Sequence, residues 1–280
     1  MRRSVRLFGI LLLFCLLLSA CSDGVETKPS LEIRFLDVGQ GDCTLVRTSA
    51  GDILIDAGPE SAQDLLCIRL RELGVTELAL AIFSHPDEDH LGGADGVLRS
   101  VKVREVWING EEETHETMTA FRSALEESGA TIRTVQSGDF TTLGDLRILV
   151  MAPITANDLL SGNEGSVVIK LYYGNISAFF TGDAEEKTES KLMEYYDRTI
   201  LKSDLYKVGH HGSSTSSGER FIQAVEPRYA VICCGRDNTY GHPHGAVLSR
   251  LESVGAEVLR TDIEGEIVFI SDGVTLERSS

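Results

Sequence analysis

The stretch Ser84-His85-Pro86-Asp87-Glu88-Asp89-His90-Leu91-Gly92-Gly93 follows an apolar run over residues 78–83, which predicts a buried strand that ends where the polar residues begin. His85, Asp87, Asp89 and His90 therefore lie together at the end of one strand. Imidazole and carboxylate groups bind Zn²⁺, Mn²⁺ and Fe²⁺, and carboxylates this close would repel one another without a cation. The stretch predicts a metal site, with an acidic surface loop as the alternative interpretation.

The same arrangement recurs in the second half of the chain. One apolar run, over residues 176–181, leads to Gly182-Asp183, and another, over residues 204–208, leads to Gly209-His210-His211-Gly212. Histidine is a frequent metal ligand, so a histidine pair between glycines favours a site over a structural loop. Six of the seven histidines lie in polar loops after apolar runs: His85, His90, His210, His211, His242 and His244.

Three aspartates in the first half of the chain also lie where strands are expected to end. Asp37 and Asp42 flank two glycines after the opening apolar run, and Asp56 closes a hairpin expected over residues 44–56. Aspartate is common in turns, so each of the three either forms a turn or orients a metal ligand.

Composition and charge restrict the range of functions. The chain has 280 residues, 42% of them apolar, which suits one large α/β domain or two small ones. Its formal charge is -17 at pH 7, and loss of the first 20 residues, which contain three arginines and no acid, would make it -20. Such a surface repels phosphate backbones over most of its area. A broad basic surface for nucleic acid is therefore excluded, and an anionic substrate would have to be held by metal.

The N-terminal segment predicts export and a lipid anchor. Three arginines precede an apolar run over residues 7–18, which is too short for an ordinary membrane span and typical of a signal peptide over residues 1–20. Leu18-Ser19-Ala20-Cys21 resembles a bacterial lipobox, which implies cleavage before Cys21 and lipid on its thiol. Residues 21–30 would then be a polar tether to the membrane. An ordinary secretory signal or an uncleaved anchor is the alternative, and either would still place the protein outside the cytoplasm.

Strands and helices alternate along the rest of the chain. Strands are expected over residues 31–38, 44–47, 52–56, 78–83, 101–108, 131–135, 146–151, 166–172, 176–181, 204–208, 229–234, 257–260 and 266–270. Helices are expected over residues 61–73, 93–100, 111–128, 185–196, 221–224 and 246–253. The pattern predicts an α/β protein with two strand-rich halves. No disulfide is predicted, because the adjacent Cys233 and Cys234 lie in an apolar run typical of a core.

The motifs HxDxDH at 85–90, TGD at 181–183 and HHGS at 210–213 resemble the metallo-β-lactamase superfamily. Within it, the chain is most similar to the extracytoplasmic hydrolase domain of ComEC-type DNA-uptake competence proteins. That similarity rests on DVGQGD at 37–42, LIDAG at 54–58, SHPDEDHLGG at 84–93, KVGHHGS at 207–213 and YGHPH at 240–244. The resemblance implies a four-layer αβ/βα sandwich over residues 31–275, with two divalent metal ions at one edge of its sheets.

The resemblance also implies seven metal ligands: His85, Asp87, Asp89, His90, Asp183, His210 and His211. The first two would bind one ion and the next two the second ion, with Asp183 as a bridge. One of His210 and His211 would complete the second site, and the sequence does not say which. Many members have a histidine in place of Asp87 and another within the segment that is here 163–166. Because the first of the two metal sites therefore has more oxygen ligands and fewer nitrogen ligands, Mn²⁺ is an alternative to Zn²⁺.

The same resemblance assigns catalytic roles to three residues: Asp89, His242 and His244. Two close cations would acidify a water between them and stabilise charge on a phosphoryl or acyl oxygen. Asp89 would help to orient that water, and the two histidines would contact the scissile group or protonate a leaving oxygen. Four residues are expected to hold the ligand histidines in one tautomer: Asp37, Gln40, Asp42 and Asp56.

The sequence thus favours an exported, lipid-anchored, metal-dependent hydrolase, and in particular a phosphodiesterase or nuclease of the ComEC-like type, with nucleic acid, such as DNA, as the favoured substrate. A phosphodiesterase for a cell-wall or lipid headgroup such as phosphorylcholine is the second interpretation. A non-catalytic binding lipoprotein is the third. A β-lactamase is disfavoured because Asp87 and the missing middle histidine remove ligands typical of those enzymes. The membrane is the expected partner, through Cys21, and no protein partner is evident from the sequence.

Overall fold

The structure, a computed structural model, describes residues 30–154 and 161–279. The expected signal peptide, the lipidation site at Cys21 and all of the tether except Ser30 therefore lie outside the described residues. In the part that is described, no helix is both long enough and apolar enough to cross a membrane.

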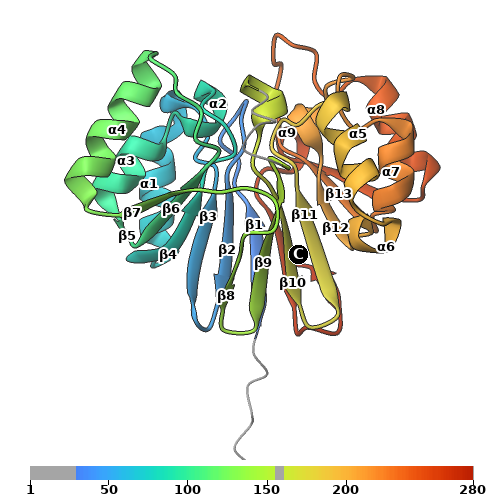
Figure 1. Ribbon diagram of the computed structural model, residues 1–280, viewed down its shortest axis with the longest axis horizontal. Coiled ribbons are helices and arrows are strands. Elements are labelled where there is room, and N and C mark those ends of the chain that lie inside the picture. The colour runs from blue at the N-terminus through green and yellow to red at the C-terminus, as the bar shows by residue number, and fades with distance from the viewer. Residues whose placement is uncertain (1–29, 155–160, 280) are drawn as a thin grey trace, which may run out of the picture.

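Two β-sheets pack face to face, and helices cover the outer face of each (Figure 1). In spatial order the first sheet contains β16 (Leu276–Arg278), β15 (Ile267–Ser271), β1 (Leu31–Phe35), β2 (Thr44–Thr48), β3 (Gly51–Ile55), β4 (Glu77–Ile82), β6 (Glu105–Ile108) and β7 (Thr131–Thr134), with β5 (Lys102–Val103) also paired to β4. The second sheet contains β14 (Glu257–Arg260), β13 (Tyr229–Ile232), β12 (Leu205–Lys207), β11 (Ile176–Phe180), β10 (Val168–Tyr173), β9 (Leu146–Ala152) and β8 (Phe140–Leu143). The expected four-layer α/β sandwich is confirmed.

The helices divide between the two outer layers in chain order (Figure 1). Those on the first sheet are α1 (Gln63–Glu72), α2 (Glu88–Leu91), α3 (Ala94–Ser100) and α4 (Glu116–Ser128). Those on the second sheet are α5 (Glu186–Tyr195), α6 (Arg198–Leu201), α7 (Glu219–Val225) and α8 (Gly245–Ser253), while α9 (Thr261–Glu264) lies after β14, near the centre of the upper edge in Figure 1. Three short 3₁₀ turns complete the set: η1 (Glu60–Ala62), η2 (Gly162–Gly165) and η3 (Gly209–Gly212).

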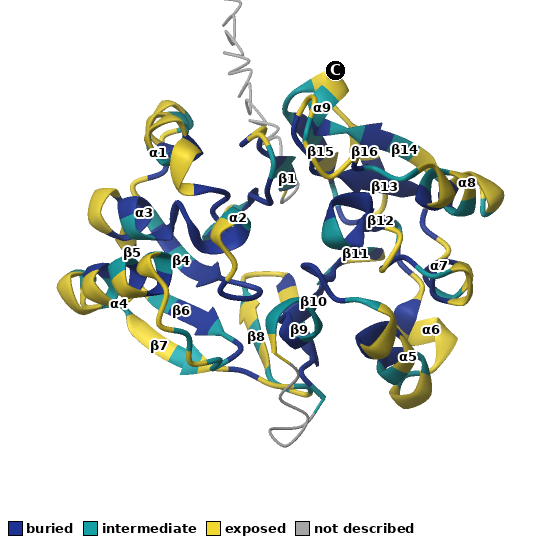
Figure 2. Ribbon diagram, turned by 90° about the horizontal axis from the view of Figure 1, so that it is seen from above, coloured by how far each residue is buried: buried dark blue, intermediate teal, exposed yellow. Residues whose placement is uncertain are grey.

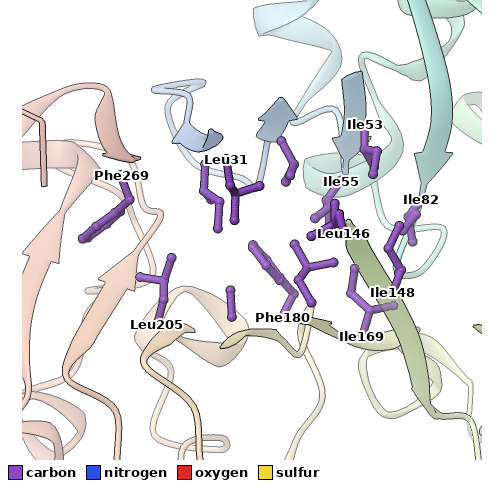
Figure 3. Close-up of a cluster of buried hydrophobic side chains, with 14 of the residues drawn as sticks. Leu31, Ile53, Ile55, Ile82, Leu146, Ile148, Ile169, Phe180, Leu205 and Phe269 are labelled. Atoms are coloured by element: carbon purple, nitrogen blue, oxygen red, sulfur yellow. The ribbon is translucent and has the colours of Figure 1, made fainter. Parts of the chain in front are cut away.

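Three apolar cores correspond to the three contacts between these layers. The central core joins the sheets, and Figure 3 shows Ile53, Ile55 and Ile82 of the first sheet near Ile148 and Ile169 of the second. A second core lies between the first sheet and α1, α3 and α4, and a third lies between the second sheet and α5, α7 and α8. Figure 2 shows the resulting pattern, with buried strands inside and exposed outer helix faces. The alternating burial along β1 follows from this arrangement, because successive side chains of a strand point to opposite faces.

Strand direction brings the polar motifs to one edge. β1, β3 and β4 run in the same direction in the first sheet, because β2 is antiparallel to both β1 and β3 and β4 is parallel to β3. In the second sheet β11, β12 and β13 are parallel neighbours. The carboxyl ends of parallel strands share an edge, so the loops after them meet there.

Several boundaries differ from the expected ones. The helix expected from residue 111 begins at Glu116. The Glu111 carboxylate instead accepts a hydrogen bond from the Gly162 backbone N–H at 3.0 Å, which holds the segment before the helix in a non-helical conformation. His115 is the N-cap of that helix, and its Nδ1 accepts from the Met118 N–H. The strand expected over 101–108 is split into β5 and β6, and β16 extends the first sheet beyond residue 275. On α1, the apolar side chains of Leu65 and Ile68 are exposed, so the apolar spacing that predicted this helix is not wholly buried.

Candidate metal centre

Loops from both sheets build one site at the shared edge. His85 and Asp87 follow β4, and the short helix α2 carries Asp89 and His90. Asp183 follows β11, and the histidine pair lies in η3, directly after β12. Residues far apart in the sequence are thereby brought together by strand topology alone.

Side chains from the loops of the two sheets approach one another within hydrogen-bond or ion-pair distance. Asp183 is central, since its Oδ1 lies 3.1 Å from His90 Nε2 and its Oδ2 lies 3.3 Å from His211 Nε2. Asp89 Oδ2 lies 3.1 Å from the same His211 nitrogen, and Asp87 Oδ2 lies 3.5 Å from His85 Nε2. Four side chains offer ligand atoms within 4.8 Å of one another, namely Asp42, His90, Asp183 and His211.

Unpaired buried atoms show that these residues fit a divalent cation. The Nε2 atoms of His85, His90 and His211 and Oδ1 of Asp183 are buried without a hydrogen-bond partner among the described residues. A buried polar group without a partner is costly, by about 1–3 kcal/mol, so such atoms are rare unless a ligand satisfies them. Three imidazole nitrogens and adjacent carboxylate oxygens are the donor set of zinc and manganese sites. The group can therefore hold metal.

The opposite nitrogen of two of these rings is held by the protein. His90 Nδ1 lies 3.0 Å from Asp56 Oδ2, and the Ser84 hydroxyl and backbone N–H both donate to the same Asp56 carboxylate. His211 Nδ1 lies 2.9 Å from the Cys233 carbonyl oxygen and 3.2 Å from Asp42 Oδ1. A proton held on Nδ1 leaves the Nε2 lone pair free for a metal. Asp42 and Asp56 thus lie where their expected orienting role requires.

Backbone conformation at two glycines allows this close approach. Gly182 has φ +52°, and a Cβ there would meet Ser84, so only glycine lets the β11 loop bring Asp183 against the β4 loop. At Gly41 a Cβ would collide with the Asp89 carbonyl oxygen, the same atom that accepts a hydrogen bond from the Asp42 N–H.

The charges at the centre are strongly coupled. Burial acts to raise the pKa of the Asp89 carboxyl, but His211 and His90 lower it to about 2. Burial likewise opposes ionisation of Asp183, yet His211 and His90 hold its pKa well below the usual range. Conversely, burial acts to lower the pKa of His90, but Asp183 and Asp56 raise it well above 6.5. The carboxylates that stabilise imidazolium here would equally stabilise a divalent cation in place of the protons.

A cavity of about 150 Å³ opens over this centre. Its lining includes Asn163, His210, Tyr240 and His242 together with four candidate metal ligands, Asp87, Asp89, Asp183 and His211. It adjoins a wider groove of about 690 Å³, and the two share Gln40, Asp87, Asp89 and Tyr240. The site is therefore open to a substrate much larger than a phosphate group.

The structure separates His210 from His211. Both have positive φ, +48° and +52°, and their side chains go to different places. His211 is buried against Asp89 and Asp183, whereas His210 Nε2 lies 3.8 Å from Asp183 Oδ2 and its Nδ1 lies 3.0 Å from Glu185 Oε1. Of the two, His211 has the geometry of a ligand to the second ion, and His210 lines the cavity.

Three other expected residues lie elsewhere than anticipated. Asp37 is exposed, and its Oδ1 accepts from the Gly39 N–H, so it forms its own turn instead of holding a histidine. Gln40 lines the cavity, but its Oε1 accepts from the Gly235 N–H at 3.0 Å. His244 is the N-cap residue of α8, and its Nδ1 accepts from the Ser214 N–H at 2.9 Å. His242, in contrast, lines the cavity as expected.

A four-layer sandwich with convergent histidines and aspartates at one sheet edge defines the class of metal-dependent hydrolases. The chain belongs to the metallo-beta-lactamase superfamily, whose family model matches residues 36–236.

Curated relatives show the similarity to competence proteins that the motifs predicted, since the chain is 30% identical over 247 residues to Competence protein ComA of Neisseria gonorrhoeae, covering 87% of this chain and 33% of that protein. The chain is 34% identical over 256 residues to ComE operon protein 3 of Bacillus subtilis, covering 85% of this chain and 33% of that protein. It is 33% identical over 282 residues to Recombination protein 2 of Haemophilus influenzae, covering 97% of this chain and 33% of that protein. The chain thus spans about a third of the length of these relatives.

Solved structures share the fold at low sequence identity. The metallo-beta-lactamase fold protein YhfI from Bacillus subtilis has a TM-score of 0.58 and 11% identity, covering 86% of this chain and all of that one. Igni18, a metallo hydrolase from the archaeon Ignicoccus hospitalis, has a TM-score of 0.55 and 16% identity, covering 86% of this chain and 98% of that one. Both likenesses concern the fold alone.

Proposed function

We propose that the protein is an extracytoplasmic, lipid-anchored, metal-dependent phosphodiesterase, with nucleic acid as its first substrate class. The observation that carries this proposal is the convergence of the unpaired His90 and His211 Nε2 atoms on Asp183, with the unpaired His85 Nε2 facing Asp87, at an open cavity. Such a centre is suited to reactions in which negative charge develops on an oxygen of the substrate. Among such substrates, the similarity to competence proteins favours phosphodiesters.

The metal ligands divide between two positions. His85 and Asp87 would hold one ion, while Asp89, His90 and His211 would hold the other, with Asp183 between them. When bound, two divalent cations supply Lewis-acid stabilisation of the charge that develops on the phosphoryl oxygens, with Zn²⁺ as the first expectation and Mn²⁺ as the alternative. The protein's part is to fix the ring tautomers through Asp42 and Asp56.

Other cavity residues would contact the substrate. Burial, with the nearby His211, His210 and His244, lowers the pKa of His242 to about 4, so its imidazole is neutral near pH 7. A neutral ring is suited to hydrogen bonding with a phosphoryl or leaving oxygen, and it is a poor proton donor at that pH. His244 is engaged with the Ser214 backbone, so His242 is the better candidate for this contact.

The exposed ring of Tyr240 favours a substrate that contains a planar group, such as a nucleic-acid base. Its side chain is 65% exposed, and its ring is stacked on His242 with centroids 5.5 Å apart and 20° between the planes. The loop that presents it is fixed by Asn238, whose side chain bonds both the N–H and the carbonyl oxygen of His242. Aromatic rings beside a phosphate site bind unpaired bases by stacking, which favours single-stranded nucleic acid over duplex.

A second candidate substrate is a phosphodiester headgroup with a positive charge, such as phosphorylcholine. The wider groove is lined by Asp87, Glu88, Asp89 and Glu116 and by no lysine or arginine of the described chain. Two of these acids are candidate metal ligands, whereas Glu88 and Glu116 are exposed and lie outside the candidate ligand set. Together with an exposed tyrosine they would attract an organic cation and repel a second phosphate.

Turnover of bis-p-nitrophenyl phosphate tests the phosphodiesterase. Full-length protein stripped of metal should regain hydrolysis with added Zn²⁺ or Mn²⁺, bind two equivalents and lose activity again with chelator. Comparison of single-stranded DNA, duplex DNA and p-nitrophenyl phosphorylcholine then ranks the two substrate classes. Absence of both metal binding and turnover would sink the proposal and leave a binding lipoprotein.

The lipid anchor requires its own test. The lipobox-like sequence before Cys21 supports it. Labelled palmitate should enter the wild-type protein in cells, and Cys21→Ser should prevent that labelling and release the protein from the membrane. Unlabelled wild-type protein would argue for an ordinary secretory signal or an uncleaved anchor.

A further inference from the structure

A buried lysine lies just behind the metal centre. Lys207, at the end of β12, is 2% exposed, and its ammonium forms an ion pair with the Asp42 carboxylate, which is 3% exposed. The same ammonium donates to the Val208 carbonyl oxygen at 2.7 Å. A buried charge is stable only when paired and hydrogen-bonded, so each of these two residues depends on the other.

Asp42 connects this lysine to the imidazoles. Its Oδ1 lies 3.2 Å from His211 Nδ1, whose hydrogen bond goes to the Cys233 carbonyl oxygen at 2.9 Å, and its Oδ2 lies 3.8 Å from His90 Nδ1. Asp42 Oδ1 is buried without a hydrogen bond among the described residues, so its contact with His211 is electrostatic. Both contacts are on the side of the ring opposite the unpaired Nε2 atoms. Backbone contacts fix the residue as well, since the Asp42 N–H donates to the Asp89 carbonyl oxygen and the Gly58 N–H donates to the Asp42 carbonyl oxygen.

Two arrangements are open to a carboxylate in this position. Asp42 is close enough to His90, Asp183 and His211 to be counted with them as a metal ligand. Its contacts, however, are to Nδ1 atoms and to an ammonium group. A cation bound directly to Asp42 would lie close to the Lys207 charge, and two positive charges about 4 Å apart repel strongly in a site with little water.

We propose that Lys207 is a positioning residue: it holds the Asp42 carboxylate beside His211 Nδ1, on the side of the ring away from the metal, and keeps this carboxylate out of the metal's ligand set. This inference rests on the proposed metal centre and adds a residue to it. Lys207 acts on the metal only through Asp42 and the His211 ring.

Metal titration of four proteins tests the coupling. Full-length wild type, Lys207→Met, Asp42→Asn and the double variant are stripped of metal and titrated with Co²⁺, with calorimetry for affinity and visible absorption for coordination. Lys207→Met should lower the affinity for the second Co²⁺ ion about 10- to 100-fold, as is usual when a residue that hydrogen-bonds or orients a metal ligand is lost. It should also change the cobalt spectrum. The metal affinity of the double variant should return to within about threefold of wild type, because the neutral amide that Asp42→Asn introduces still lies beside His211 and no unpaired charge is left.

Lys170→Met is the matched control. Lys170 is another buried lysine of the second sheet, 1% exposed, but its ammonium donates to the carbonyl oxygens of Ile200 and Lys202, away from the metal centre. Its replacement should leave cobalt affinity and spectrum unchanged. Lys207→Met with wild-type affinity and spectrum, or a double variant as weak as Lys207→Met, would overturn the proposal.

A further comparison does not require Lys207→Met to fold. In Asp42→Asn the lysine has no carboxylate to hold, so adding Lys207→Met should change the dissociation constant by less than about threefold. A further tenfold loss there would show that Lys207 acts independently of Asp42 and would reject the proposal. Failure of the wild type to bind cobalt would instead count against the proposed metal centre itself.

Discussion

His211 Nε2 lies 3.1 Å from Asp89 Oδ2, although the histidine belongs to the second sheet and the aspartate to the first. This contact crosses the interface between the two halves of the sandwich. The second metal position therefore exists only when both halves are folded against each other.

Replacement of His210 and replacement of His211 should have different effects on metal binding and activity. His211→Ala removes an Nε2 atom that faces both Asp89 and Asp183, so the protein should lose the second metal equivalent and more than about 100-fold in kcat/KM. His210→Ala should keep both equivalents and lose about tenfold, since His210 is bound to Glu185. Elemental analysis of the two variants checks this. Loss of metal in His210→Ala but not in His211→Ala would reverse the assignment.

Asp183→Ala should empty both positions. Asp183 is the carboxylate shared by His90 and His211, and its Oδ1 is otherwise unpaired. Removal takes away the one carboxylate that faces the Nε2 atoms of both rings, so we expect no bound metal and no measurable hydrolysis, with near-wild-type circular dichroism. Asp37→Ala, at the exposed turn, is the control and should stay within about twofold of wild type. Activity retained in Asp183→Ala would reject its bridging role.

Tyr240 should affect substrate binding more than the chemical step. Tyr240→Ala removes the exposed ring at the cavity mouth, and loss of one stacked base is worth about 1–3 kcal/mol, so KM for a single-stranded oligonucleotide should rise about 5- to 160-fold. Tyr240→Phe keeps the ring and should behave as wild type. Bis-p-nitrophenyl phosphate provides a reference substrate without a base. If KM for p-nitrophenyl phosphorylcholine rises in Tyr240→Ala while that for the oligonucleotide does not, the headgroup interpretation is favoured.

Glu189 should make stability depend on pH. Burial raises its pKa to about 7, against the two N–H donors of Ser217 and Gly218 that act to lower it. Between pH 4.5 and 7 the unfolded chain loses this proton while the folded protein retains it. The favourable contribution is therefore complete below the unfolded pKa and is lost, up to about 3 kcal/mol, as pH rises through the folded pKa.

Urea unfolding of metal-free protein at several pH values measures this slope. Glu189→Gln should flatten it, because glutamine does not titrate. The variant should also be about 1–2 kcal/mol less stable at about pH 5, since one of the two backbone donors then faces an amide group. An unchanged slope in Glu189→Gln would assign the pH dependence to other groups.

Local patterns were sufficient for most of the fold. The ends of β4, β11 and β12 could be predicted because an apolar run changes abruptly to polar residues, and the same change marks the motif loops. Short elements such as β8 and α6 were not predicted, because so few residues give too little periodicity. The start of α4 was missed because Glu111 serves a distant loop, and no local pattern records that.

The site was less accessible to sequence reasoning. Asp37 and Asp42 belong to one motif, yet one is exposed and the other buried, because the turn between them includes Gly39 and Gly41 at φ +77° and +148°. The choice between the two histidines likewise depends on backbone angles. The Lys207–Asp42 pair depends on strand β12 lying behind the first loop, and a lysine beside a histidine motif gives no sign of its partner.

The direction of β1 has a consequence for orientation. Leu31 starts this strand beside Ser271, at the opposite edge of the sheet from the motif that follows Phe35, and the chain before Leu31 therefore joins the domain at the far end (Figure 1). If that chain is tied to a membrane as proposed, the catalytic opening points outward from the lipid surface. Large substrates in the surrounding medium would then reach the site without obstruction. Lipids of the same leaflet would reach it only if the domain rotated toward the membrane.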